Sequence, residues 1–84
     1  MSLIYIKEIF CDQHSVGIRV DGFLDSQSLP ILKDFCDKYF KGNKQVHLHL
    51  GGLRHISREG MEYLQEMRKK VIYVEPPEFI RFKD

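Results

Sequence analysis

Two histidines alternate with apolar residues in the segment 46–50. His47 and His49 are two positions apart, so on a β-strand their side chains point to the same face. Imidazole nitrogens bind zinc, but a zinc site needs a third protein ligand, and His14 and His55 are the remaining candidates of this residue type. The ordinary interpretation is a pair of histidines on an open sheet face, which a second copy of the chain could cover. The alternative hypothesis is a small-ligand or metal-binding sensor at this face.

A second group of residues with unusual types is the segment Ser57–Gly60. Ser57 can cap a helix, because its hydroxyl can accept a hydrogen bond from an amide of the first turn. Arg58 then opposes the helix macrodipole at a cost of a few tenths up to about 1 kcal/mol, which Glu59 partly offsets. Gly60 costs up to about 1 kcal/mol relative to alanine, which close approach of another backbone would explain. Two such residues in succession indicate a functional surface; a solvated arginine and a glycine that packs on the sheet are the alternative.

The sequence shows no set of residues sufficient for catalysis. Cys11 falls in a predicted turn and Cys36 in a predicted helix, without the spacing of a metal or redox pair. We expect both to be reduced, with Cys36 packed in the core. Gly51-Gly52 is not followed by the Lys-Ser or Lys-Thr of a phosphate-binding loop. No nucleophile, base and orienting group form a recognisable set, so we expect neither enzymatic activity nor a cofactor.

Composition predicts a single domain over residues 1–84. The 84 residues are 43% hydrophobic and 30% charged, which is enough for one core. Lys and Arg total 13 and Asp and Glu total 12, so the net charge of +1 argues against nucleic acid as a partner. The apolar runs are far shorter than the ~20 residues that span a bilayer, and no leader precedes the first strand-like segment. We therefore expect a cytoplasmic protein without a membrane segment.

Apolar periodicity predicts four strands and two helices that would position these groups. Residues 15–21 and 46–50 alternate apolar and polar residues, and residues 4–10 are rich in β-branched and aromatic residues. The helices repeat apolar residues every three or four positions. The predicted strands cover residues 4–10, 15–21, 46–50 and 71–74, and the predicted helices cover 29–40 and 57–69.

Glycines and prolines set the expected ends of these elements. Gly22 is expected to end the second strand, and Gly51-Gly52 the third. Pro76-Pro77 breaks the chain after the fourth strand, and residues 78–82 have room for one or two helical turns.

The order of elements predicts an α/β fold with a four-stranded mixed sheet. The first two strands form an antiparallel hairpin, and the remaining strands follow in chain order and in parallel. Strand-helix-strand connections of this kind are almost always right-handed, so both helices should lie on one face of the sheet. The other face should stay open, with Arg19, His47 and His49 pointing outward.

Two segments of this sequence, 16–25 and 46–64, resemble the STAS domain of anti-sigma factor antagonists and sulfate transporters. In that family a strand ends at a glycine followed by a short apolar-Asp step, which Gly22, Leu24 and Asp25 reproduce. A later strand leads into an Asp-Ser-Ser-Gly-Leu helix start, which here reads Ser-Arg-Glu-Gly-Met over residues 57–61. The resemblance covers nearly the whole chain and implies the same open-faced sheet.

The resemblance also implies how the family's switch would differ in this chain. In anti-sigma factor antagonists, a partner kinase phosphorylates the first serine of Asp-Ser-Ser-Gly, and the added charge breaks the complex. Arg58 stands at that position, and an arginine cannot accept phosphate. Ser57 is the neighbouring candidate phospho-acceptor, and a helix cap is its alternative role.

The function that the resemblance implies is a non-catalytic protein–protein interaction module of a bacterial signalling or transcription-regulatory system. Its partner would be an anti-sigma factor kinase or another STAS-containing regulator, and a homodimer is a further expectation. The predicted partner-binding residues are Asp25, Ser26, Ser57, Arg58, Glu59 and Gly60.

Overall fold

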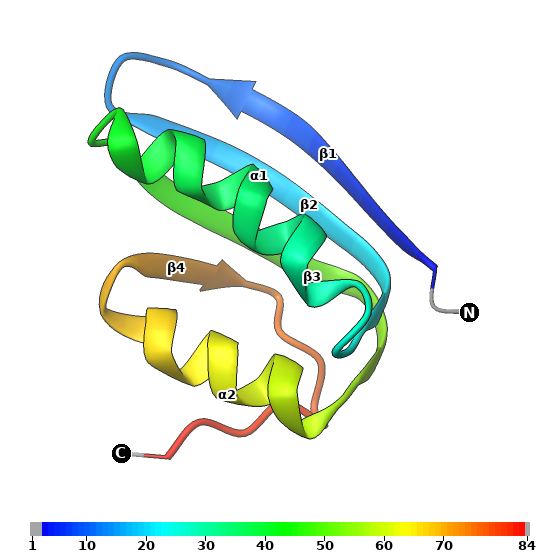
Figure 1. The fold of residues 1–84 in the computed structure, drawn as a ribbon. Helices are drawn as coiled ribbons and strands as arrows, with labels where there is room; N and C mark the ends of the chain where they lie inside the picture. Colours follow the sequence, from blue (N-terminus) through cyan, green and yellow to red (C-terminus); the bar gives the residue numbers. More distant parts are fainter. Residues whose placement is uncertain (1–2, 84) are drawn as a thin grey trace.

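The chain begins with an antiparallel hairpin, which leads into two strand-helix units. The computed structural model describes residues 3–83. The elements, in chain order, are β1 (Ile4–Cys11), β2 (Ser15–Leu24), α1 (Leu29–Lys41), β3 (Gln45–Ile56), α2 (Arg58–Glu66), the 3-10 turn η1 (Met67–Lys69) and β4 (Val71–Val74), as labelled in Figure 1.

The hairpin turn between β1 and β2 is fixed by one carboxylate. Asp12 Oδ1 accepts hydrogen bonds from the backbone amides of His14 at 2.8 Å and Ser15 at 2.7 Å. These amides lower the pKa of Asp12, because they stabilise its charged form. The Lys44 ammonium donates to the carbonyl of the same aspartate, so the turn also contacts the loop that precedes β3.

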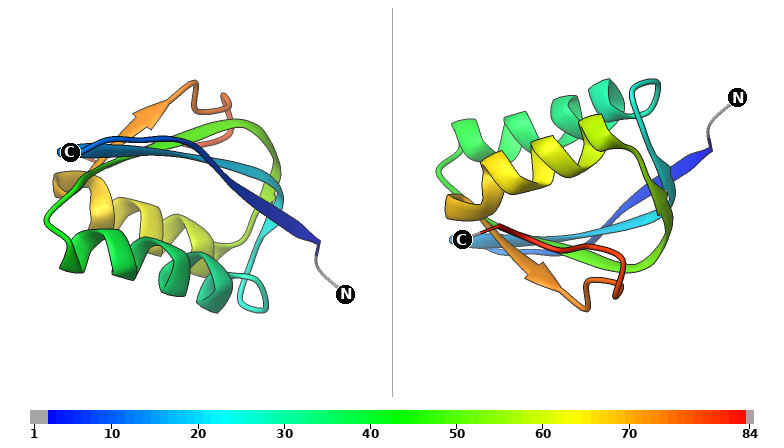
Figure 2. Two further views of the ribbon diagram at one scale, coloured as in Figure 1. Left: turned by 90° about the horizontal axis from the view of Figure 1, so that it is seen from above. Right: turned by 90° about the horizontal axis from the view of Figure 1, so that it is seen from below.

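The sheet has the predicted order and directions. Its strands follow as β1-β2-β3-β4, with β1 antiparallel to β2 and the other pairs parallel. Figure 2 shows α1 and α2 side by side on one face of the sheet. The predicted α/β class, the strand order and the placement of both helices on one face are therefore confirmed.

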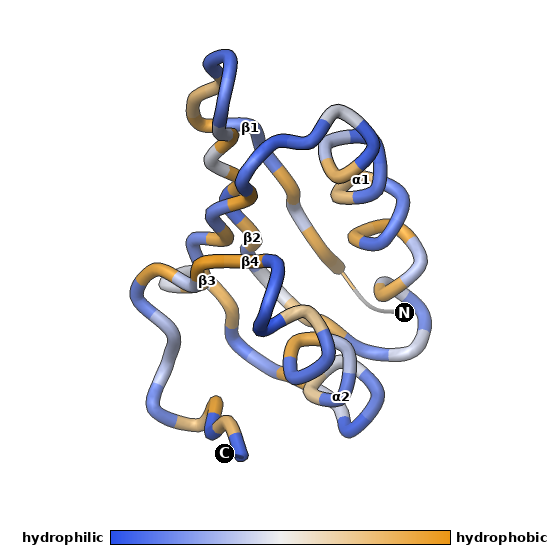
Figure 3. Tube along the Cα trace, turned by 90° about the vertical axis from the view of Figure 1, so that its left-hand side faces the viewer, coloured by the Kyte–Doolittle hydropathy of each residue, from blue (hydrophilic) through white to orange (hydrophobic). Residues whose placement is uncertain are grey.

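The core lies between the two helices and one face of the sheet. Alternate residues of β2 and β3 point into it and are fully buried: Val16, Ile18 and Val20 from β2, and Val46, Leu48 and Leu50 from β3. Leu32 and Cys36 of α1 and Leu64 of α2 pack onto them. Figure 3 shows that β4 is mostly apolar, and its residue Ile72 is 47% exposed on the face away from the helices.

Glycines do not end the strands as the sequence predicted, and both predicted ends are wrong. β2 continues through Gly22, which has φ 96°, a conformation that glycine tolerates without a Cβ penalty. The next amide, Phe23 N–H, donates to the Leu3 carbonyl at 2.8 Å and keeps β2 attached to the start of β1.

β3 likewise runs through Gly51-Gly52 as far as Ile56. His49 pairs with Arg19 and Gly52 with Asp21, so two residues of β3 oppose one residue of β2. This arrangement is a β-bulge, which absorbs an extra residue without ending the ladder.

A similar irregularity occurs in the edge strand β1. The pairing with β2 shifts between Glu8 and Phe10, so Ile9 is an extra residue there. Glu8 points to the helix side, where its carboxylate accepts a 2.5 Å hydrogen bond from the Tyr39 hydroxyl of α1. That hydrogen bond raises the pKa of Tyr39 to about 12.

The C-terminal segment is not the short helix that the sequence predicted for residues 78–82. After Pro76-Pro77 a single turn forms, closed by a 3.0 Å hydrogen bond from Ile80 N–H to the Pro77 carbonyl, and the chain then continues without regular structure. Ile80 is buried and the Phe82 ring stacks on Tyr73 with centroids 5.0 Å apart. Burial of these two alternate side chains favours an extended path over a helix. The second predicted helix runs to Lys69 as expected, as the α-helix α2 up to Glu66 and the 3-10 turn η1 after it.

The two cysteines give a direct check on the core. Cys36 is fully buried in α1, and burial raises the pKa of its thiol to about 11, whereas Cys11 is exposed. Because alkylating reagents attack the thiolate, iodoacetamide at neutral pH should modify Cys11 alone in the folded protein. Mass spectrometry of the digested product measures this, with unfolding in urea exposing Cys36. Equal modification of both thiols in the folded wild-type protein, or modification of Cys36 in the folded Cys11→Ser variant, would show that α1 is not packed as described.

Candidate functional site

The start of α2 is built on a serine cap, as predicted. Ser57 has an extended backbone, φ −84° and ψ 173°, and its Oγ accepts a 3.1 Å hydrogen bond from the Gly60 amide. Its own amide donates to the Leu24 carbonyl at 2.8 Å. The first turn of α2 is therefore held against the end of β2, and the predicted capping role of Ser57 is confirmed.

Gly60 is buried because the backbone of β2 passes beside it. A Cβ at this position would lie 2.8 Å from the Leu24 carbonyl oxygen and 3.0 Å from Ile56 Cγ1. The first contact is with backbone, which cannot move aside as a flexible side chain can. This packing within the domain accounts for the glycine, so the residue positions the helix start.

Arg58 and Glu59 point away from the domain. The Arg58 side chain is 89% exposed, and its Nε lies 3.8 Å from Glu62 Oε1 one turn along the helix. Exposed pairs of this kind contribute little to stability. The cation at the start of α2 therefore has no packing role, and Glu59 is the only acidic residue of the same first turn.

The loop that precedes α1 is positioned by Asp25. Its Oδ1 accepts hydrogen bonds from the amides of Gln27 at 3.0 Å and Ser28 at 3.1 Å. Ser28 is buried, and its hydroxyl donates to the Phe23 carbonyl at 2.7 Å. Asp25 thus shapes the loop, whereas Ser26 is exposed.

The structure brings the two predicted segments together. Leu24, which ends β2 and precedes Asp25, accepts the hydrogen bond from Ser57 and contacts the Gly60 position. We call the surface formed by Asp25, Ser26 and residues 57–60 the helix tip. Within it, Ser26, Arg58 and Glu59 are exposed, and the other members hold the shape.

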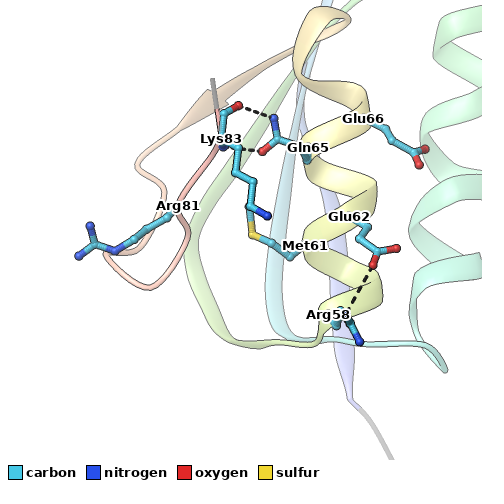
Figure 4. Close-up of a pocket in the computed structure, with 7 residues that line it drawn as sticks. All are labelled: Arg58, Met61, Glu62, Gln65, Glu66, Arg81 and Lys83. Carbon is cyan, nitrogen blue, oxygen red and sulfur yellow. Dashed lines mark hydrogen bonds and ion pairs between the residues drawn. The ribbon is translucent and has the colours of Figure 1, made fainter.

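A groove adjoins the helix tip that the sequence did not predict. It lies between α2 and the C-terminal segment and has a volume of about 550 Å³ (Figure 4). Gln65 and Lys83 form its closed end, since the Gln65 amide donates to the Lys83 carbonyl at 2.8 Å and accepts from its backbone N–H at 2.9 Å. The lining residues are Arg58, Met61, Glu62, Gln65, Glu66, Arg81 and Lys83. The groove is therefore charged on both sides around one apolar side chain, Met61.

The two histidines of β3 lie on the sheet face opposite the helices, as predicted. The His47 ring contacts Phe10 edge to face, with centroids 5.8 Å apart. His49 lines a small hollow with Arg19 and Glu75. Within residues 3–83, no three His, Cys, Asp or Glu side chains gather in a way that could hold a metal ion. The third ligand that the metal hypothesis requires is not supplied by this part of the chain.

Two tyrosines of the core have shifted pKa values. Burial raises the pKa of Tyr63 and of Tyr73, and the Tyr73 hydroxyl donates to the Leu64 carbonyl at 2.6 Å. Both tyrosines are thereby kept neutral and serve packing.

Comparison with known proteins adds no relative. No protein-family model matches the chain, and no curated protein sequence matches it significantly. Within residues 3–83, none of the helices has the length and apolar character needed to cross a membrane.

Proposed function

We propose that this chain is a non-catalytic protein–protein interaction module of a bacterial signalling or transcription-regulatory system, acting in the cytoplasm in the manner of an anti-sigma factor antagonist. The helix tip is its docking surface. The observation that carries the proposal is the exposure of Arg58 on the first turn of α2, where a cation opposes the helix macrodipole.

The partner surface that suits the helix tip is acidic. Arg58 presents a planar group with several donors, and arginine pairs well with carboxylates in that geometry. Ser26 adds a neighbouring hydroxyl, and Ser57 and Gly60 fix the backbone beneath the cation. An anti-sigma factor kinase, or another STAS-containing regulator, with carboxylates at its docking site is the proposed partner.

Binding at this surface is proposed to be independent of phosphorylation. Arg58 occupies the position of the family's phospho-acceptor, and Ser57 Oγ is engaged as the cap of α2. A complex formed here would therefore persist in the presence of ATP. Incubation with the purified partner kinase and ATP should leave Ser57 without phosphate by mass spectrometry, and phosphate on Ser57 would contradict this part of the proposal.

Charge reversal at the helix tip tests the docking surface. Arg58→Glu should weaken binding to the partner by at least about tenfold, because like charges would then face each other. Partners are recovered from a bacterial lysate on immobilised wild-type protein, identified by mass spectrometry, purified and titrated by calorimetry against each variant. The substitution favours the helix macrodipole, so loss of binding would not come from unfolding.

The matched control is Lys41→Glu, a charge reversal at the far end of α1. It should bind as the wild type does, with circular dichroism confirming that both variants are folded. Equal affinity of the Arg58→Glu variant and the wild type would overturn the helix tip as the docking surface.

A further inference from the structure

The sheet face opposite the helices carries exposed apolar and aromatic side chains from three strands. We call this surface the bare face. Tyr5 is 62% exposed, Phe10 40% and Ile72 47%, and the two histidines of β3 lie between them. Exposed apolar side chains gathered on one face of a small domain are a feature of binding surfaces.

Glycines keep the bare face flat. Gly17 of β2 lies beneath the Phe10 ring, and a Cβ at this glycine would overlap the ring. Gly52 of β3 lies beneath the Asp21 carboxylate, where a Cβ would overlap in the same way. The side chains above these glycines therefore lie down on the sheet, and the resulting surface can approach another flat surface closely.

The centre of the bare face carries one positive and one negative side chain, which could pair with the same two side chains of a second copy. Arg19 Nε lies 3.0 Å from both carboxylate oxygens of Asp21, two residues along the same strand. A two-fold axis that crosses β2 between these residues would place each Arg19 opposite the second copy's Asp21. An interface built on one patch used by both subunits requires such self-complementarity.

We propose that the bare face binds a second copy of this chain, forming a symmetric dimer. Strands lie about 4.8 Å apart and advance about 3.3 Å per residue, so the face covers on the order of 500 Å². Two copies would then bury about 1,000 Å², near the lower limit for a specific interface. An interface of this size belongs with weak, reversible associations.

The dimer goes beyond the proposed function and does not depend on it. The helix tip lies on the helix side, at the start of α2, so a second copy on the bare face leaves it accessible (Figure 2). If the chain proves to be a monomer, the proposal that Arg58 binds a partner still stands. If the Arg58→Glu variant binds the partner normally, the proposed dimer still stands.

Two exposed isoleucines on opposite sides of the domain test the inference. Ile72 lies on the bare face and is 47% exposed, whereas Ile31 lies on α1 and is 54% exposed. Sedimentation velocity over low to high micromolar concentrations should show a monomer–dimer equilibrium for the wild type and for Ile31→Asp. Ile72→Asp should remain monomeric throughout. A wild-type monomer at every concentration, or a dimer that withstands Ile72→Asp, would overturn the proposal.

Exchange of the charges at positions 19 and 21 is a second test of the proposed dimer, and it does not depend on apolar contacts. Arg19→Asp places acidic groups opposite each other in both halves of the interface and should weaken the dimer by at least about tenfold. The double variant Arg19→Asp with Asp21→Arg restores opposite charges and should recover most of the affinity. If the double variant is as weak as the single one, the two-fold axis is not where we place it and the proposed dimer is wrong.

Discussion

Leu48→Ala should lower the free energy of unfolding by about 3 kcal/mol, as expected for a fully buried leucine in a packed core. Leu48 lies in the middle of β3, which is paired on both sides, and its side chain faces the two helices. The neighbouring backbone therefore cannot collapse into the cavity. A domain of this size has a total stability on the order of 4 to 12 kcal/mol, so the variant would lose a large share of it.

Urea unfolding followed by far-ultraviolet circular dichroism measures this loss as a lower midpoint with an unchanged slope. The matched control is Ile31→Ala, which removes an aliphatic side chain from an exposed position and should cost less than about 1 kcal/mol. Comparable losses in the two variants would mean that the core is not centred on β3.

Gly22→Ala is the second substitution with a large expected effect, about 2 to 4 kcal/mol. Gly22 has φ 96°, where a side chain is strained, and a Cβ there would lie 2.5 Å from the Leu3 carbonyl oxygen. Relief requires β1 to move away from β2. The hydrogen bond from Phe23 N–H to Leu3 should then break, and exchange of that amide with deuterium should accelerate.

The control for this substitution is Gly42→Ala, after the last turn of α1. Gly42 has φ −84°, and a Cβ there would meet nothing closer than the Tyr39 carbonyl at 3.6 Å. Alanine also restricts the unfolded chain, so this variant should be as stable as the wild type or slightly more stable. Equal behaviour of the two alanine variants would contradict the left-handed conformation of Gly22.

The sequence predicted the sheet because its two central strands alternate apolar and polar residues. Val16, Ile18 and Val20 mark one buried face, and handedness then places both helices on it. The strand ends were not predictable, because a glycine pair reads as a break from sequence alone. In the structure Gly52 makes room for the Asp21 carboxylate and stays within the ladder. That contact joins residues of two different strands, so no pattern within either strand could predict it.

The sequence predicted the part of the candidate site that depends on residues close together in the chain. Ser57 caps α2 through an amide three residues away, and such spacing is visible in a sequence. The groove beside Ser57 could not be predicted from the sequence. It forms because the C-terminal segment returns to α2, where Lys83 accepts a hydrogen bond from Gln65. A helix over residues 78–82 was the natural prediction, and burial of Ile80 overrides it.

The extra residue at Ile9 has a consequence for assembly. β1 is an outer strand, and its unpaired amides and carbonyls could template the addition of further chains without limit. The irregularity at Ile9 interrupts that row. Association along the hydrogen-bonding direction is thereby hindered, which should lower the tendency of the protein to form fibres.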